Sequence, residues 1–412
     1  GVDGISVAMI LLTAIVIFTG VFISWQIEYL TKEFFVLFIF LSSGVYGFFI
    51  SLDLFTMFLF YEFEVIPMYL LIGMWGSGRK EYGAMKLTLM IMAGSALLIV
   101  GLLGIYFNSG LTFDLTQITK SQLPISTQVF FFPFVFIGFG VSAALFPFHT
   151  WSPDGHSAAP TAVSMFAAGV LMKLGAYGCY RVGIFLLPEG AQAWSSFFII
   201  LSAIGVVYGA FGAIWQKDLK YINAYSSISH CGLILFALMM LNETATTGAF
   251  LQMISHGLMT ALFFAVIGMI YSRTHTRMIN EMGGLMKVVP LLSVMYVIAG
   301  LASLGLPGLS GFVAEMTVFF GSFQHADVFH RVATIVVASS IVITAVYMLR
   351  VIGILFYGKL NTNQQELSDA RWFEKVSGYV LIFSVALLGL APLWLYNLIQ
   401  DSIATFFENF KM

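Results

Sequence analysis

Charged side chains stand inside several long apolar stretches of this chain. Lys173 lies in the middle of the apolar run 161–187, Glu315 in 290–323, and Glu62 and Glu64 in 55–76. A charge at bilayer depth is unfavourable by several kcal/mol unless it is paired or hydrated, so such residues indicate a functional site. A buried lysine can take up and release a proton as its surroundings change. We therefore expect Lys173 to carry protons; a static lysine bonded to a carbonyl or carboxylate is the alternative.

Other polar residues within apolar runs are candidates for the same path. His230 and His256 are suited to relaying protons because imidazole titrates near neutral pH; buried histidines with purely structural hydrogen bonds are the alternative. Lys86 is expected to lean toward Glu62, whereas Arg350 is near a helix end and is expected to reach the interface.

Two passages rich in proline and glycine interrupt the apolar runs. The first contains Pro147, His149, Pro153, Asp154, His156 and Pro160, and the second contains Pro307 between several glycines. Non-helical backbone at membrane depth is tolerated only where it is buried in protein or lines a wet cavity. The polar side chains of the first passage are expected to order it by hydrogen bonding, and no metal site is expected because a fourth ligand is lacking.

The composition identifies the class of protein. Hydrophobic residues make up 59% of the 412, charged residues 9%, and the mean hydropathy is +0.95. These values are typical of an all-α polytopic membrane protein. The net charge of −2 gives no basic surface for nucleic acid. Cys179 and Cys231 both lie in apolar runs, which argues against disulfides, iron–sulfur clusters and thiolate zinc sites on this chain.

Apolar runs of about 20 residues predict membrane-spanning helices. We expect about twelve: Ile5–Trp25, Phe34–Leu52, Phe55–Gly76, Ala84–Phe107, Gln128–Phe148, Thr161–Leu187, Trp194–Trp215, Tyr221–Leu241, Gly248–Tyr271, Pro290–Phe323, His330–Tyr357 and Ser377–Ile399. The tenth is interrupted by 304–311 and is expected to be one span made of two half-helices.

The distribution of basic residues predicts the orientation. Lys32, Arg79, Lys80, Lys217, Lys220, Arg273, Arg277, Lys287, Lys359, Arg371 and Lys375 fall on one side, and Lys120, Arg181, Arg331 and Lys411 on the other. Short cytoplasmic loops carry an excess of Lys and Arg, so the first side is expected to face the cytoplasm or matrix.

Interrupted helices in corresponding places indicate an inverted repeat. We expect an N-terminal span in 1–33, repeats over 34–187 and 194–357, and a C-terminal loop and span over 358–412.

Four motifs carry a resemblance to a known family. They are Tyr61-Glu-Phe-Glu-Val-Ile-Pro67-Met-Tyr69 with Gly73-Met-Trp-Gly76, Pro147-Phe-His-Thr-Trp-Ser-Pro-Asp-Gly-His-Ser-Ala-Ala-Pro160-Thr161, Lys217-Asp-Leu-Lys-Tyr-Ile-Asn-Ala-Tyr-Ser-Ser-Ile-Ser-His-Cys-Gly232, and Gly305-Leu-Pro-Gly308 with Phe312-Val-Ala-Glu315. Together they resemble the antiporter-like, proton-translocating membrane subunits of respiratory complex I, of the chain 4 or subunit M type, which are related to Mrp-type antiporter subunits. The resemblance covers nearly the whole chain. It implies about fourteen spans, so two are expected to be missing ahead of Gly1.

The resemblance assigns roles to individual residues. Glu62 matches the glutamate of an ion pair, Lys173 the central lysine, Glu315 the acid beside the second break, and His230 and His256 a polar axis between the halves. At the position of the lysine that usually pairs with Glu62, this chain has Ser142. Lys86 is then the nearest candidate partner in sequence, and a protonated Glu62 is the other possibility. The matching residues Asp218 and Lys220 are expected to do structural or surface work in a loop.

The resemblance also implies a setting. The chain is expected to move H⁺ along an intramembrane polar axis, coupled to quinone reduction elsewhere in an NADH–quinone oxidoreductase. No cofactor is expected on this chain; FMN, iron–sulfur clusters and quinone would belong to partner subunits. Expected partners are neighbouring antiporter-like subunits and lipid, in a bacterial inner membrane or an organellar inner membrane. A subunit of an Mrp-type antiporter or membrane-bound hydrogenase, and a structural subunit with an inactive path, remain the alternatives, as does Na⁺ in place of H⁺.

Overall fold

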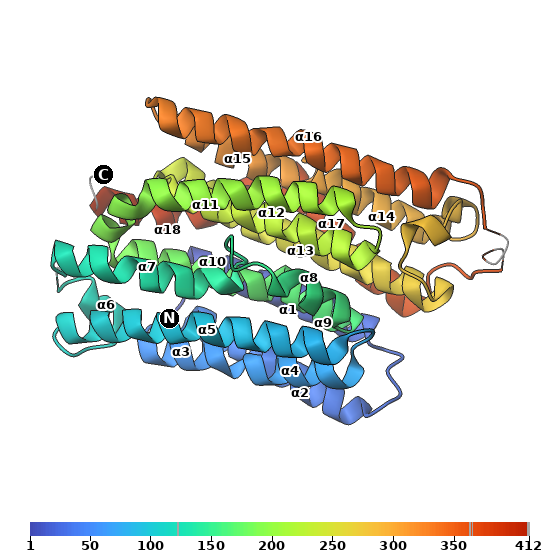
Figure 1. The fold of residues 1–412 in the computed structure, drawn as a ribbon, viewed down its shortest axis with the longest axis horizontal. Helices are drawn as coiled ribbons and strands as arrows, with labels where there is room; N and C mark the ends of the chain where they lie inside the picture. Colours follow the sequence, from blue (N-terminus) through green and yellow to red (C-terminus); the bar gives the residue numbers. More distant parts are fainter. Residues whose placement is uncertain (122, 362–363, 365, 410–412) are drawn as a thin grey trace.

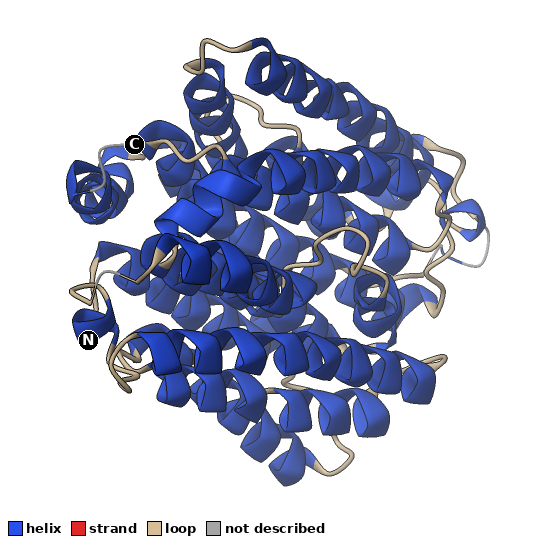
Figure 2. Ribbon diagram, turned by 60° about the vertical axis from the view of Figure 1, so that its left-hand side comes forward, coloured by secondary structure: helices blue, strands red, loops and turns tan. Residues whose placement is uncertain are grey.

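The computed structural model describes residues 1–121, 123–361, 364 and 366–409, and this part of the chain is a bundle of helices joined by short loops (Figures 1 and 2). Eleven of its helices are long and apolar enough to cross a membrane. The half-helices α14 and α15 together supply one further crossing, because α14 starts and α15 ends at opposite ends of the bundle (Figure 1). The predicted all-α polytopic fold is confirmed.

The helices are α1 Gly4–Ile23, α2 Thr31–Ile50, α3 Leu54–Phe63, α4 Val65–Trp75, α5 Lys80–Asn108, α6 Leu115–Ile118, α7 Ile125–Ser142, α8 Trp151–Ala158, α9 Thr161–Phe166, η1 Ala167–Leu171, α10 Met172–Gly178, η2 Cys179–Ile184, α11 Pro188–Trp215, α12 Leu219–Met239, α13 Glu243–Thr274, η3 Ile279–Glu281, η4 Leu285–Lys287, α14 Pro290–Ser303, α15 Ser310–Phe323, α16 Val328–Tyr357, α17 Trp372–Leu390 and α18 Leu393–Asn409. Of the short ones, η1 and η2 are π-helical and η3 and η4 are 3₁₀ turns.

Both predicted breaks are present, although the first starts earlier than expected. Helix α7 ends at Ser142 and not at Phe148, and a short α8 follows the non-helical passage. Ala144 in that passage has a φ of 56°, a conformation that cannot continue a right-handed helix. In the second break Gly305 and Gly308 have φ of 62° and 91°, which only glycine adopts without strain.

Glu64 interrupts the third span between α3 and α4. Pro67 has no N–H to donate to the carbonyl four residues earlier, at Phe63, so the helical ladder loses a bond at this point. The local irregularity turns Glu64 into the bundle.

The last predicted span is wrong in its bounds. A single helix over Ser377–Ile399 was expected, but α17 ends at Leu390 and a separate α18 begins at Leu393. Pro392 cannot continue the ladder, which explains the division. The described part of α18 packs beside α1 and α13 at the end of the bundle that holds both termini (Figure 1).

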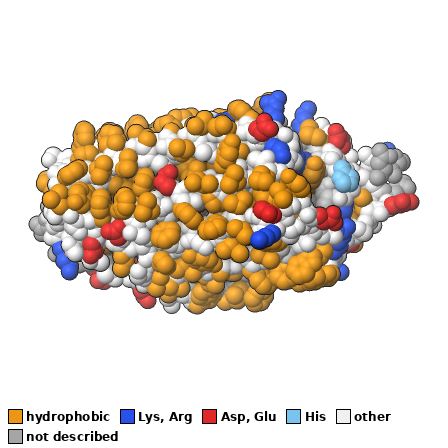
Figure 3. All heavy atoms as spheres, turned by 90° about the horizontal axis from the view of Figure 1, so that it is seen from below, with side chains coloured by type: hydrophobic (Ala, Val, Ile, Leu, Met, Phe, Trp, Pro, Cys, Tyr) orange, Lys and Arg blue, Asp and Glu red, His pale blue; other side chains and the backbone are white. Residues whose placement is uncertain are grey.

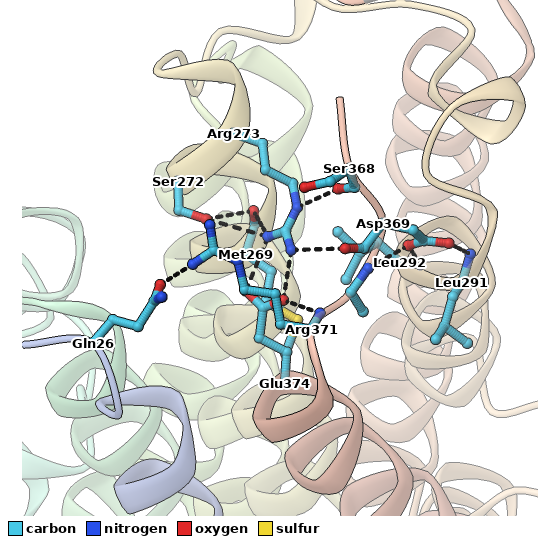
Figure 4. Close-up of polar contacts among 11 residues, drawn as sticks. Gln26, Met269, Ser272, Arg273, Leu291, Leu292, Ser368, Asp369, Arg371 and Glu374 are labelled. Carbon is cyan, nitrogen blue, oxygen red and sulfur yellow. Dashed lines mark hydrogen bonds and ion pairs between the residues drawn. The ribbon is translucent and has the colours of Figure 1, made fainter. Parts of the chain in front are cut away.

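A cluster of polar contacts joins three helices at the opposite end of the bundle (Figure 4). Arg273 on α13 donates to both carboxylate oxygens of Glu374 on α17, at 2.9 and 2.6 Å, and to the backbone carbonyls of Ser368 and Asp369. The Asp369 carboxylate accepts the first two free N–H groups of α14, at 2.8 and 3.3 Å. Arg273 therefore joins α13 to α17 and to the segment before α17, and Asp369 of that segment caps the start of the half-helix α14.

The surface combines a broad apolar face with basic residues gathered toward one end of the bundle, as in a membrane protein. Hydrophobic side chains cover most of the face in Figure 3, and most of the Lys and Arg on that face lie toward its right-hand end. That end carries the loops predicted to face the cytoplasm or matrix. Lys411, predicted on the other side, lies outside the described residues.

This orientation makes a labelling prediction. A cysteine at Ser77, in the loop between α4 and α5, should react with a membrane-impermeant thiol reagent only after right-side-out vesicles are opened. A cysteine at the exposed Ser121, at the opposite end, should react in intact vesicles. Both native cysteines are buried, so background labelling should be low. The reverse labelling pattern would invert the topology.

Candidate functional site

Lys173 is fully buried in the centre of the bundle. Its Nζ donates to the carbonyl of Ala168 at 2.5 Å and to Nδ1 of His256 on α13 at 2.7 Å. Ala168 belongs to the π-helical η1, in which backbone bonds run between residues five apart, and it lies five residues before Lys173. The widened turn thus presents a carbonyl to the ammonium.

Two glycines bring the helices of Lys173 and His256 together. A Cβ at Gly257 would lie 2.6 Å from the carbonyl oxygen of Gly169, closer than any real contact allows. Small residues at such a crossing let backbones approach closely, as is common between membrane helices. The short Lys173–His256 distance depends on this approach.

The polar chain continues from His256 to Glu315 through His230. The two imidazole centroids are 5.1 Å apart, and His230 Nδ1 lies 3.6 Å from Glu315 Oε1. Gln252 donates to His230 Nδ1 at 3.1 Å, so Nδ1 holds the lone pair and Nε2 carries the hydrogen that faces Ser303 at 3.3 Å. The chain of groups therefore runs from the span that follows the first break to the second half of the broken helix α14–α15.

A small cavity lies at the Glu315 end. It has a volume of about 10 Å³ and is lined by His230, Ser303, Glu315 and Thr344 among others. A polar cavity of this size holds about one water. The second break also makes room for the carboxylate, because a Cβ at Gly305 would lie 2.8 Å from Glu315 Oε2.

The first half of the bundle contains two carboxyl groups without a cation. Both oxygens of the fully buried Glu64, and Oε1 of the half-buried Glu62, have no hydrogen-bond partner among the described residues. The hydroxyl of Tyr61 lies near both acids and near Ser142. Ser142 donates a long hydrogen bond of 3.4 Å to the carbonyl of Leu171. The position where the family resemblance places a lysine thus supplies no charge.

The expected pairing of Lys86 with Glu62 is wrong. Lys86 Nζ lies 2.6 Å from Asp154 Oδ2, a side chain of α8, and both groups are partly exposed. Tyr221 donates to the other oxygen of Asp154 at 2.8 Å. Asp154 was favoured as an ordering residue of the break, and it does bind groups of α5 and α12 there, whereas Lys86 points to the edge of the bundle.

The histidines of the first break differ in setting. His149 stacks on Phe146 at a ring-centroid distance of 5.4 Å and meets Tyr208 edge to face at 4.8 Å. His156 is fully buried against Trp151, and neither of its ring nitrogens has a partner among the described residues.

The prolines of the two breaks lie at helix boundaries. Pro147 precedes α8, Pro153 is in its first turn, Pro160 caps α9, and Pro307 separates α14 from α15.

Residues 51–344 match the family described as NADH:quinone oxidoreductase/Mrp antiporter, transmembrane region. The chain belongs to this family. Among curated family members, chain 4-2 of the NAD(P)H-quinone oxidoreductase of Synechocystis sp. is 37% identical over 376 residues, which are 89% of this chain and 67% of that one. The chloroplastic chain 4 of Cryptomeria japonica is 35% identical, over 98% of this chain and 83% of its own length.

Solved structures of the antiporter family have the same fold. A chain of respiratory complex I from Thermus thermophilus superposes with a TM-score of 0.92 at 25% identity, covering 98% of this chain and 85% of its own. A chain of the Mrp complex from Dietzia sp. superposes with a TM-score of 0.89 at 19% identity, covering 99% and 84%.

Two polar residues of this antiporter-family chain were misjudged from the sequence, and a third was placed correctly. Glu64, given little weight beside Glu62, is the more deeply buried of the two acids. Lys220 was expected in a loop or at the surface but is 4% exposed, with Nζ 2.6 Å from the carbonyl of Ala159. Asp218 has the expected structural role, since it caps α12 and pairs with Arg277 at 3.1 Å. Because Lys220 is in the first turn of α12, its stem can run inward along the helix, which sequence position alone does not reveal.

Proposed function

We propose that this chain is a proton-translocating, antiporter-like subunit of an NAD(P)H–quinone oxidoreductase of the complex I type. The observation that carries the proposal is the buried chain Lys173–His256–His230–Glu315, which runs from the span 161–184 to the broken helix α14–α15. Ionisable groups at this depth form proton relays in pumps and transporters. Redox cofactors, namely FMN and iron–sulfur clusters, belong with the quinone site on partner subunits.

Each group of the chain has a distinct task in this account. Lys173 holds a proton as an ammonium bonded to Ala168 and His256. When a neighbouring charge makes the ammonium unfavourable, Lys173 passes the proton to Nδ1 of His256. His230 and one water carry it onward to Glu315, since the gap of 3.6 Å there exceeds a direct hydrogen bond. The two inverted repeats, 34–187 and 194–357, would contribute the two ends of the path, Lys173 from the first and Glu315 from the second.

The first half works differently in this proposal, because Ser142 brings no cation to Glu62 and Glu64. An unpaired anion at bilayer depth is unfavourable, so Glu62 and Glu64 are both protonated and act as neutral hydrogen-bonding groups that water can contact. Glu62→Gln should then reduce proton pumping by less than about twofold, since an amide resembles a protonated acid in shape and polarity.

A lysine at position 142, where the family resemblance places one, should make pumping sensitive to Glu62→Gln. With Ser142→Lys the new ammonium needs a carboxylate partner, so Glu62→Gln added to that variant should impair pumping and assembly far more than it does alone. If Glu62→Gln alone reduced proton pumping as much as Lys173→Met does, that result would contradict an uncharged Glu62. Proton uptake by vesicles, normalised to electron transfer, is the measurement.

A Mrp-type antiporter subunit is the second candidate, and it rests on the superposition with the Mrp complex from Dietzia sp.. Purification from membranes in mild detergent separates the two. Co-purifying flavin and iron–sulfur subunits are the result expected for the oxidoreductase. Co-purification with small membrane subunits alone would favour the antiporter and overturn the first proposal.

A further inference from the structure

The connection between α15 and α16 gathers three side chains that can ligate a metal. His325, Asp327 and His330 each offer a ligand atom, and these atoms all lie within 4.8 Å of one another. The two imidazole rings lie face to face, with centroids 4.3 Å apart and an angle of 16° between their planes. The connection between α15 and α16 lies at the end of the bundle away from the basic loops (Figure 1).

A hydrogen bond to a backbone carbonyl favours the tautomer of His325 that a metal ligand needs. Its Nε2 lies 2.8 Å from the carbonyl oxygen of Met240, so Nε2 carries the hydrogen and donates it. The lone pair is then on Nδ1. The Asn242 amide nitrogen lies 3.1 Å from the same Nε2, but it donates to the carbonyl of Gly321 at 2.9 Å, and the shorter Met240 contact takes the Nε2 hydrogen. Ligating histidines commonly donate their second ring nitrogen to a backbone carbonyl in this way.

Asp327 and His330 complete the donor set at the start of α16. The Asp327 carboxylate accepts from the backbone N–H of His330 at 3.1 Å, and it lies 2.7 Å from His330 Nδ1. Asp327 is the N-cap of α16, and this capping bond holds the side chains of Asp327 and His330 next to each other, one turn apart. The neighbouring cation Arg331 directs its Nε to the carbonyl of His325, at 3.0 Å.

We propose that His325, Asp327 and His330 bind a divalent transition-metal ion, of which Zn²⁺ fits the donors best. Two imidazoles and one carboxylate with water as a fourth ligand form a common tetrahedral zinc site. Ligand atoms in such a site are about 3.3 Å apart, whereas here they lie within 4.8 Å of one another. Rotation of these half-buried and exposed side chains about their χ angles would bring the ligand atoms to that distance.

A bound ion would join three parts of the second half. His325 follows α15, Asp327 and His330 begin α16, and the Met240 carbonyl belongs to the turn between α12 and α13. These are the helices that carry Glu315, His230 and His256. Zinc therefore ties together the outer ends of the helices around the polar chain, and this binding does not depend on whether the chain moves protons.

Equilibrium dialysis of ⁶⁵Zn²⁺ against the purified complex tests the site. His325→Ala and His330→Gln should each remove one equivalent of bound zinc, or raise the dissociation constant for zinc at least tenfold. The matched control is His275→Asn, an exposed histidine at the other end of the bundle, which should keep the equivalent. His330→Cys should restore binding, because a thiolate is a good zinc ligand, and so separates ligation from folding. Unchanged stoichiometry and affinity in both loss variants would overturn the proposal.

Discussion

Replacing Lys173 by methionine is expected to reduce proton pumping on the order of tenfold or more, because a positioned acid–base group contributes at least that much to a proton transfer. Assembly should survive, since an apolar side chain is easily accommodated where Lys173 is fully buried. Lys173→Arg should be impaired as well, because guanidinium does not release its proton. The readout is proton uptake by reconstituted vesicles during quinone reduction.

The exposed Lys287 supplies the control for this experiment. Lys287→Met removes an equal charge at the inner surface, outside the polar chain, and should pump at the unaltered rate. Pumping by Lys173→Arg at the rate of the unaltered chain would mean that Lys173 acts only as a fixed charge.

Replacing Arg273 by methionine is expected to lower the free energy of unfolding by about 3–5 kcal/mol, since it leaves the carboxylate of Glu374 buried without its cation. The side chains of Arg273 and Glu374 are only 6% and 7% exposed, so solvent screening does little to reduce this effect. The loss also frees two carbonyls, those of Ser368 and Asp369, to which Arg273 donates (Figure 4).

Two further variants make the Arg273 result specific. Lys375→Met, one residue after Glu374 but exposed, should change stability by less than about 0.5 kcal/mol. The double variant Arg273→Met/Glu374→Met should recover part of the loss, because removing both charges leaves none unpaired. Unfolding in mixed detergent micelles measures all of them. Equal stability of Arg273→Met and Lys375→Met would show that the cluster does not hold α13 and α17 together.

Long apolar runs and their interruptions could be predicted from the sequence, because hydropathy and proline act locally. The break at Pro307 and the buried position of Lys173 follow directly from such signals. The division of the last span at Pro392 was missed because a proline inside an apolar run is compatible with a kinked single span.

Side-chain partners could not be predicted, since they depend on how distant helices are rotated and packed. Lys86 is close to Glu62 in sequence, yet it bonds to Asp154 because α5 packs against α8. The burial of Glu64 follows from the irregular turn between α3 and α4, which a regular helical wheel does not contain. The substitution at Ser142 was visible in the sequence, whereas the missing cation around both acids needed the three-dimensional arrangement.

The central claim is that Lys173 and Glu315 are two ends of one proton path. Protons pumped per electron pair by Lys173→Met, Glu315→Gln and the double variant test it most directly. For residues that act as a unit, the double variant should pump about as poorly as either single variant, and electron transfer should continue in all three. Two results would contradict a single path through Lys173, His256, His230 and Glu315. One is a double variant whose loss of pumping equals the product of the two single losses; the other is an unaltered number of protons per electron pair in Glu315→Gln.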